Sequence, residues 1–375
     1  MGKFATLAVA VVFALGLTSS ATAENVLDKE ATILDEFSNE DVAVVSPYSL
    51  ETALSMALEG AKGETAREIE EFLGLSTEEA RKEAEETAKR FDEQESVSTA
   101  NAFWHDDARP FLDSFVEVME DSYDADVEGT NFDDFEKTTR LVNEWCSERT
   151  NGKIDEIVTE RDMKNMEAVL TNALYVNAKW LEPLEASEVK ETFMGSAGEQ
   201  EVDFLHGSAE IFYENDEATA FGKKYDDGLT FVGILPKNEE FSMESLDLSN
   251  LLESETYEYE VNVSMPKFEV EFGKSLKGAL IDRGVVACFD DVTADFSGMA
   301  DMENYDLMIS DVLQKSVVSV DENGTEAASA TAILMTDKCM PAFETKSVKL
   351  DRTFAFMILD EKTGRVLFLG KVGKI

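Results

Sequence analysis

The first third of the chain repeats apolar residues at the spacing of α-helices. Ser46 is a suitable N-cap with Pro47 in the first turn, and the stripe that follows predicts a buried helix: Leu50, Ala53, Leu54, Ala57 and Leu58. A second helix is predicted to stop at Gly74, with an apolar face of Ile69, Phe72 and Leu73. The charged run from Thr77 to Ser96 is typical of a solvated surface helix.

Another helix is expected in residues 138–158, before strand-like patterns take over. Its inward side chains are predicted to be Leu141, Val142, Trp145 and Cys146. The helix gives way to a turn at Asn151 and Gly152.

Strand patterns dominate the remainder. Residues 167–180 contain a short apolar run typical of a strand buried on both faces. Residues 257–272 alternate, but the apolar phase flips after Pro266, which marks a bulge or a change of strand. Residues 353–372 predict two apolar strands joined by a turn at Lys362 to Gly364. Helices come early and strands late with no linker between them, so we predict a single α+β domain.

Residues 1–23 differ from the rest and predict a secretory signal peptide. Lys3 supplies a positive start, an apolar run follows, and Ala21 to Ala23 resemble a cleavage site. A membrane anchor is the alternative, but the apolar run is short for a membrane span and acidic residues follow it. The mature protein, residues 24–375, is therefore expected to be secreted and extracellular.

The charge balance excludes two classes of partner. Thirty-three basic against 79 acidic residues give a formal net charge of −46. This acidic protein should repel nucleic acid and anionic membrane surfaces. It also fits adaptation to high salt, where like charges are screened.

No enzyme is predicted, because no catalytic constellation is recognisable. The two histidines, His105 and His206, are far apart in sequence, and there is no nucleophile elbow, phosphate-binding loop or metal-binding motif. We expect no metal and no cofactor. Cys146, Cys288 and Cys339 are too few for a disulfide scaffold and leave at least one free thiol.

The segment from Glu322 to Lys338 has the alternation of a strand but few side chains that would fix it in one place. One face carries no charge and is mostly small, formed by Thr325, Ala327, Ser329, Thr331, Ile333 and Met335. Glu326 is the only charged residue between Thr325 and Thr336. Such a segment can be exposed in one state and inserted in a sheet in another, without burying an ion.

Motifs along nearly all of the mature chain resemble the serpins, a family of serine protease inhibitors. The matching stretches, in order, are VVSPYSLETALSMALEGAKGETAREI, STANAFW with DSYDADVEGTNF, VNEWCSERTNGKI, TNALYVNAKW, FVGILP, VSMPKFEVEF, GVVACFDDVTADFSGM, VLQKSVVSVDENGTEAASATA and DRTFAFMILDEKTGRVLFLGKV. The resemblance implies about nine helices, three β-sheets and a single serpin domain over residues 24–375. An exposed reactive-centre loop would lie at about residues 322–345.

Inhibitory serpins offer this loop as bait, form a covalent acyl-enzyme with the protease and insert the cleaved loop into the large sheet. The resemblance assigns the loop hinge to Glu322, Gly324, Thr325, Glu326, Ala327, Ala328, Ser329, Ala330, Thr331 and Ala332. The family's spacing places the reactive bond between Lys338 and Cys339, which suits a trypsin-like serine protease. Met335 or Met340 would suit a chymotrypsin-like protease, and a solvated loop charge is the alternative reading of Lys338.

Further positions carry over from the family one by one. Ser46, Ser49 and Asn172 match the polar shutter beneath the strands that part, and Trp180 matches the aromatic residue at the breach, where the hinge enters. Gln314 stands where the family usually has histidine. Since glutamine hydrogen-bonds but does not ionise, the network should lack pH sensitivity.

Several alternatives remain open on sequence alone. A non-inhibitory serpin acting as carrier, chaperone or storage protein would be cleaved without a stable complex, and papain-like cysteine proteases are another target class. Cys339 would be an idle thiol or form a mixed disulfide. A heparin-like cofactor is not expected next to the acidic segment Thr77 to Ser96, and a monomer is expected. Sequons occur at Asn262 and Asn323. The second lies in the hinge, where a glycan would obstruct insertion, so we expect Asn323 not to be glycosylated.

Overall fold

The structure is a computed structural model, and it carries no ligand or partner chain. It describes residues 27, 31–37, 39–108, 110–150, 152–163, 166, 168–300, 307–325 and 344–375. The predicted signal peptide and the predicted reactive bond, Lys338–Cys339, lie outside these residues.

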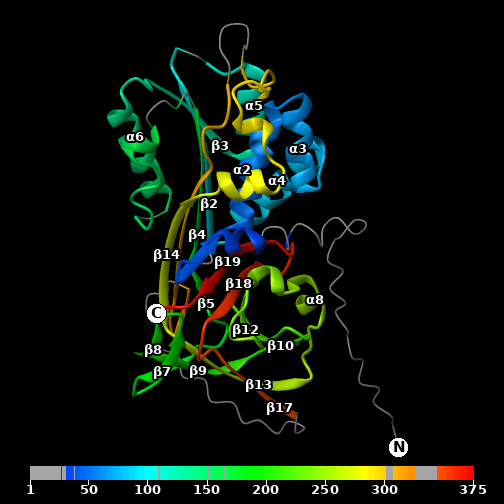
Figure 1. The fold of residues 1–375 in the computed structure, drawn as a ribbon, viewed down its shortest axis with the longest axis vertical. Coiled ribbons are helices and arrows are strands. Elements are labelled where there is room, and N and C mark those ends of the chain that lie inside the picture. Colours follow the sequence, from blue (N-terminus) through cyan, green and yellow to red (C-terminus); the bar gives the residue numbers. More distant parts are fainter. Residues whose placement is uncertain are drawn as a thin grey trace, which may run out of the picture.

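Most helices gather at one end of the molecule and around the long strands, whereas α8 (Leu248–Glu253) lies in the other half, beside β10 (Ile211–Glu214) and β12 (Leu229–Pro236) (Figure 1). Their bounds are α2 (Pro47–Gly60), α3 (Gly63–Leu73), α4 (Thr77–Asp92), α5 (Asp113–Tyr123), α6 (Phe135–Arg149), α7 (Glu160–Met163), α8 (Leu248–Glu253) and α9 (Lys277–Asp282). Short 3₁₀ turns are η1 (Leu34–Phe37), η2 (Met243–Ser245) and η3 (Ala287–Phe289). No helix of the described chain is long and apolar enough to span a membrane.

The predicted helix ends are confirmed by their cap geometry. Ser46 has an extended backbone, and its side chain accepts a hydrogen bond from the Ser49 N–H at 3.1 Å, which satisfies a free donor of the first turn. Gly74 ends α3 in the left-handed region at φ 68°. Glycine adopts this conformation without the strain of a Cβ, so the chain turns there into α4.

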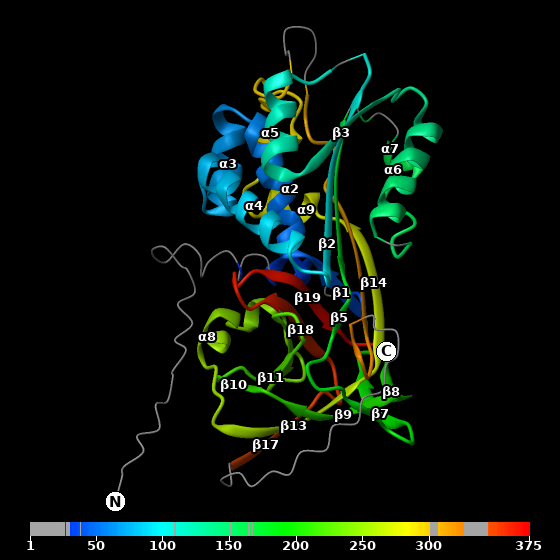
Figure 2. The same ribbon diagram turned by 180° about the vertical axis from the view of Figure 1, so that it is seen from behind.

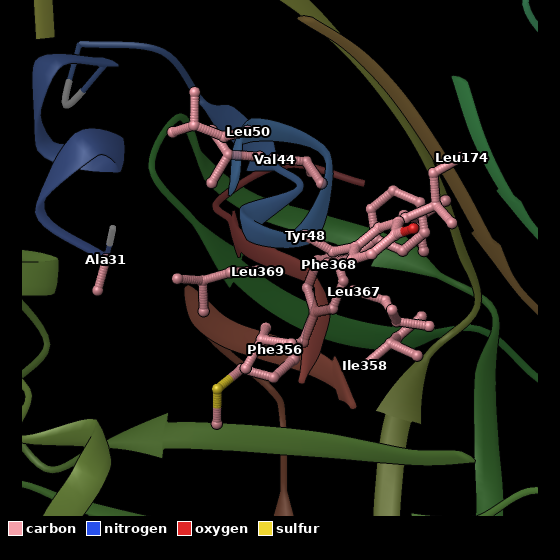
Figure 3. Packing of buried hydrophobic residues seen from close by; sticks show 14 of the residues in the cluster. Ala31, Val44, Tyr48, Leu50, Leu174, Phe356, Ile358, Leu367, Phe368 and Leu369 are labelled. Atoms are coloured by element: carbon pink, nitrogen blue, oxygen red, sulfur yellow. The ribbon is translucent and has the colours of Figure 1, made fainter. Parts of the chain in front are cut away.

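A six-stranded sheet forms the centre of the hydrophobic core. Its order is β1 (Val42–Val45), β19 (Val366–Val372), β18 (Phe354–Asp360), β12 (Leu229–Pro236), β11 (Ala218–Lys224) and β10 (Ile211–Glu214). Phe356 and Leu369 of the predicted C-terminal hairpin are fully buried, and Tyr48 of α2 lies among the same apolar side chains (Figure 3). The first helix is thus fixed against the last strands of the chain.

A four-stranded sheet at the opposite end takes up the strand before Pro266. Its order is β17 (Glu344–Lys349), β13 (Tyr259–Pro266), β9 (Phe204–Ala209) and β6 (Glu185–Ala186), beside the hairpin β7 (Glu191–Gly195) and β8 (Gly198–Val202). After Pro266 the chain enters β14 (Phe268–Ser275), which belongs to a different sheet. The phase flip in the sequence therefore marks a change of strand.

The central layer consists of two hydrogen-bonded groups of strands that share one chain segment. One group has the order β3 (Ala125–Thr130), β2 (Val97–Asp106) and β4 (Ala168–Val176). The other has the order β14, β15 (Leu313–Val320), β16 (Gly324–Thr325) and β5 (Ala178–Lys179). Only Asn177 separates β4 from β5, so the two groups form a single layer at that point. Helices α2 to α5 lie on one side of this layer and α6 on the other (Figure 2).

Candidate functional site: an opening in the central sheet

Two long strands of the central layer lie side by side without pairing. In the described residues, β4 pairs only with β2, and β15 pairs with β14 and β16. A cavity of about 70 Å³ lies at this opening. Its lining includes residues 168–172 of β4, Leu313 and Gln314 of β15, and the α2 side chains Ser49, Leu50 and Ala53. The central layer therefore has an opening between β4 and β15 that faces helix α2.

The short strand β16 closes one end of this opening. Thr325 is opposite Val320 of β15 on one side and Ala178 of β5 on the other, and Gly324 is opposite Lys179. A Cβ on Gly324 would lie 2.0 Å from the carbonyl oxygen of Ala178, so only glycine fits this approach. The beginning of the predicted hinge is thus already a strand of the sheet.

Trp180 holds the turn that leads into β16. Its indole Nε1 donates to the carbonyl oxygen of Asp321 at 2.9 Å, and its backbone N–H donates to that of Asn323 at 2.8 Å. The backbone N–H of Leu184 donates to the carbonyl oxygen of Glu322 at 2.9 Å. The carbonyl oxygens of the three successive residues 321–323 therefore all accept hydrogen bonds from Trp180 or Leu184, in the segment that follows β5.

Tyr225 supplies a second contact that the sequence did not reveal. Its hydroxyl lies 2.6 Å from Oγ1 of Thr325, and its ring stacks on Trp180 with centroids 4.3 Å apart. Burial raises the pKa of the Tyr225 phenol well above its ordinary value, and the hydrogen bond with Thr325 opposes this rise. The phenol therefore stays neutral and keeps its donor.

Lys267 and Glu322 form an ion pair at the edge of the same site. Lys267 Nζ lies 2.8 Å from Glu322 Oε2. The hydrogen bond lowers the pKa of the Glu322 carboxyl and raises that of the Lys267 amine. Both side chains are about two-fifths exposed, at 38% and 44%, so solvent screens the pair.

A buried lysine lies beneath Trp180. Lys223 is fully buried; its Nζ donates to the carbonyl oxygen of Ser208 at 2.9 Å and lies 6.0 Å from the centroid of the Trp180 ring. Burial lowers the pKa of Lys223, and the nearby Glu210 carboxylate opposes that shift. The Trp180 ring thus lies within reach of a cation–π contact with Lys223.

The predicted shutter residues lie around the open end of the layer. Gln314 Oε1 accepts a hydrogen bond from the Ser46 N–H at 2.8 Å, and Gln314 Nε2 donates to the Ser46 carbonyl oxygen at 2.9 Å. This two-point contact ties β15 to the start of α2. Glutamine makes both bonds in one protonation state, which supports the expectation of a contact without pH sensitivity.

Two buried polar atoms at the opening lack a hydrogen-bond partner in the described chain: Asn172 Oδ1 and Ser316 Oγ. Asn172 uses its Nδ2 to donate to Asn101 Oδ1 at 2.5 Å. Leaving a buried polar atom unsatisfied costs about 1–3 kcal/mol. Asn172 on β4 and Ser316 on β15 therefore carry a cost that a strand between them could remove.

Some of the predicted site residues lie close together in the structure, and others are not among the described residues. Glu322, Gly324 and Thr325 lie around Trp180, while Ser46, Ser49, Asn172 and Gln314 lie around the cavity. The rest of the hinge, from Glu326 to Ala332, lies outside the described residues, as do Lys338 and Cys339.

The histidines serve local contacts in different parts of the molecule. His105 Nδ1 lies 2.9 Å from the carbonyl oxygen of Asp106, and His206 Nε2 lies 2.6 Å from Glu191 Oε1. Within the described chain, no group of three or more His, Cys, Asp or Glu side chains is arranged to hold a metal ion.

A protein-family model described as "Serpin (serine protease inhibitor)" matches residues 31–375. The chain belongs to the serpin family. It is 34% identical over 353 residues to an uncharacterized serpin-like protein of Thermococcus kodakarensis, and the alignment covers 89% of this chain and 81% of that protein. It is 30% identical over 353 residues to a serine protease inhibitor of Cyanea capillata, covering 88% of this chain and 91% of the relative.

Solved structures agree with this assignment and confirm the serpin fold. The crystal structure of Serpin48 from the insect Tenebrio molitor matches with a TM-score of 0.82 and 30% identity, covering 94% of this chain and 98% of that chain. The predicted α+β class is therefore correct. The three predicted sheets correspond to the six-stranded sheet, the four-stranded sheet of β17, β13, β9 and β6, and the central layer.

Proposed function

We propose that this serpin is a secreted suicide inhibitor of trypsin-like serine proteases. The protease attacks the bond between Lys338 and Cys339 and forms an acyl-enzyme, and the cleaved loop then enters the opening between β4 and β15. The observation that carries the proposal is β16, because the first hinge residues already occupy the top of that opening.

The register of β16 predicts the positions that the remaining hinge residues would take on insertion. Each step forward from Thr325 is a step back along β4 and along β15. If insertion continued this register without a bulge, Ala327 would lie between Val176 and Val318, Ser329 between Leu174 and Ser316, and Thr331 between Asn172 and Gln314.

This register matches the chemistry of the opening. Ser329 would lie beside Ser316 Oγ and Thr331 beside Asn172 Oδ1, and both of these buried atoms lack a partner among the described residues. Ala327 arrives between two apolar residues, where a small side chain can be buried. In this register, Ser329 and Thr331 would each bring a hydroxyl group to a buried polar atom that lacks a hydrogen-bond partner in the described chain. Ala327 would bring only a methyl group to a site between apolar side chains.

Incubation with trypsin tests the proposal directly. We expect a covalent complex that survives SDS, and a released fragment whose sequence begins at Cys339. Cleavage at that bond without a complex would make the protein a substrate, as for a non-inhibitory serpin. Cleavage by chymotrypsin after Met335 or Met340, or capture of a papain-like protease, would assign another target class.

A pair of hinge variants tests the insertion step. Thr331→Arg would place a charge between Asn172 and Gln314, so it should turn the inhibitor into a substrate while cleavage continues at its normal rate. Ala328→Arg is the matched control, because its side chain would face the other side of the layer, beside half-buried Tyr175 and Val317. Equal loss of complex in both variants would contradict the register.

Secretion is tested at the other end of the chain. We expect the protein recovered outside the cell to begin at Glu24, after removal of residues 1–23. Retention of those residues in a soluble intracellular protein would overturn this part of the proposal.

A further inference from the structure

The turn that leads from β15 into β16 ends in an asparagine that is followed by glycine. Asn323 is the last residue of the turn after Val320, and Gly324 is the first residue of β16. Both hydrogen bonds of Asn323 within the described chain are made by its backbone, and the residue is half-buried. Its side-chain amide group is therefore not held by any described partner, although it sits in the middle of the hinge contact.

Asp321 lies directly over the two backbone nitrogens of this dipeptide. Its Oδ1 accepts from the Asn323 N–H at 2.7 Å and from the Gly324 N–H at 3.2 Å. A carboxylate within hydrogen-bond reach of an N–H is placed to remove that proton as a general base. Gly324 carries no Cβ, so its nitrogen is the least hindered of any residue for attack on a neighbouring group.

We propose that Asn323 is a site of self-catalysed deamidation, with Asp321 as the general base. The Gly324 nitrogen forms a bond to Cγ of Asn323, and its proton passes to Asp321 Oδ1. The bond between Cγ and the amide nitrogen breaks, and that nitrogen leaves as ammonia with the proton returned by Asp321. Water then opens the cyclic imide at one of its two carbonyl carbons, which gives aspartate or isoaspartate, and no oxidant or reductant is consumed.

The modification has a structural consequence at the breach. Isoaspartate adds one carbon to the main chain at position 323 and leaves a carboxylate beside Asp321 and Glu322. The chain beyond it cannot shift to compensate, because Gly324 fits closely against Ala178. We therefore expect the hydrogen bond from the Trp180 N–H to the Asn323 carbonyl oxygen to be lost, and the hinge to leave its place in the sheet.

The test is peptide mapping of the intact purified protein after timed incubation at 37 °C, which separates asparagine, aspartate and isoaspartate at position 323.

Substitution of the base gives an independent readout. Asp321→Asn keeps an oxygen that can accept both N–H groups but removes the base, so deamidation at Asn323 should slow by about 100-fold, the lower end of general-base effects. Asn323→Gln should show no product at this position, and Asn151–Gly152 serves as the internal comparison in every digest. An unchanged or faster rate in Asp321→Asn, with Trp180 amide exchange still protected, would refute the proposal.

These measurements do not depend on protease inhibition. If the protein proves to be a substrate rather than an inhibitor, the deamidation result stands. If Asn323 stays intact over the same period in which Asn151 is converted, the inference fails while the proposed function is untouched.

Discussion

The hydroxyl of Tyr225 and the hydroxyl of Thr325 lie 2.6 Å apart in a fully buried environment, 100 residues apart in sequence. Tyr225 follows β11, and Thr325 is the last described residue before Glu344. One hydrogen bond therefore connects the hinge to the six-stranded sheet at the core of the molecule.

Removal of this bond should loosen the hinge. Tyr225→Phe keeps the ring stacked on Trp180 but leaves Thr325 Oγ1 without its partner, so we expect the free energy of unfolding to fall by about 1–3 kcal/mol. Urea denaturation measures the change. Tyr213→Phe is the control, since it removes another buried hydroxyl on β10, away from the hinge. Equal losses in the two variants would argue against a special role for the Tyr225 contact.

Gly324→Ala should expel β16 from the sheet. The added Cβ would lie 2.0 Å from the Ala178 carbonyl oxygen and 2.8 Å from Cα of Lys179, and both are backbone atoms that cannot rotate away. Hydrogen exchange at the Trp180 amide should become fast, because its acceptor on the hinge moves. Gly278→Ala is the control, since a Cβ there meets nothing within 4 Å and should change little. Retained protection in Gly324→Ala would show that the strand adapts.

The Lys267–Glu322 pair should make the hinge sensitive to acid and to salt. The pKa of Glu322 is lowered, so its contribution is fully present above its ordinary value of 4.5 and is lost as pH falls through the folded value. The pKa of Lys267 is raised, so its contribution is present below 10.5 and is lost as pH rises through the folded value.

Lys267→Met should therefore reduce stability by less than about 1 kcal/mol at neutral pH, since the pair is partly exposed. The difference from the native protein should shrink in high salt and as the pH falls through the lowered pKa of Glu322. Lys274→Met, which removes a similarly exposed ion pair with Glu40, is the control. A hinge as protected in Lys267→Met as in Lys274→Met would contradict a role for this pair.

Loss of the Gln314 side chain should open the layer further. Gln314→Leu leaves the N–H of buried Ser46 without its partner, whereas the Ser46 carbonyl oxygen keeps the Leu50 N–H, so the expected cost is about 1–3 kcal/mol. Thermal unfolding, together with native gels for aggregation, measures the effect. Gln200→Leu removes only one weak hydrogen bond, at 3.4 Å to Ile375, and should be close to neutral.

The described cysteines should resist alkylation in the native protein. Burial raises the pKa of Cys146 and of Cys288 to about 12, and the thiolate is the reactive form. Iodoacetamide at pH 8 should therefore modify at most one thiol per molecule, which we assign to Cys339. Mass spectrometry after digestion identifies the site. Native-state labelling of Cys288 at the rate of the unfolded protein would contradict the burial.

The sequence predicts the elements of this fold better than the contacts between them. The helix after Ser46 and the strands on either side of Pro266 are visible because their apolar period is local. Trp180 is found only through the family resemblance. Tyr225 is not found at all, since its partner is 100 residues away and no local pattern marks it.

The opening beside β4 illustrates the second limit. Residues 167–180 read as one buried strand, and nothing in their composition indicates that, among the described residues, β4 pairs with β2 alone. The gap between β4 and β15 in the described chain arises because β16 is only two residues long. That gap is a property of the assembled layer. The unsatisfied atoms of Asn172 and Ser316 become visible only there.

The length of the chain between β16 and β17 limits how many residues could join β16 while the backbone is intact. β17 begins at Glu344, so 18 residues, 326–343, connect it to Thr325. Each residue added to β16 carries the growing end about 3.3 Å from its start, and the rest of the connection has to span that distance back. At most about nine residues can therefore enter while the backbone is continuous. In the proposed mechanism, a single cut would remove this tether, so contour length would limit how far the strand can extend before the bond is hydrolysed.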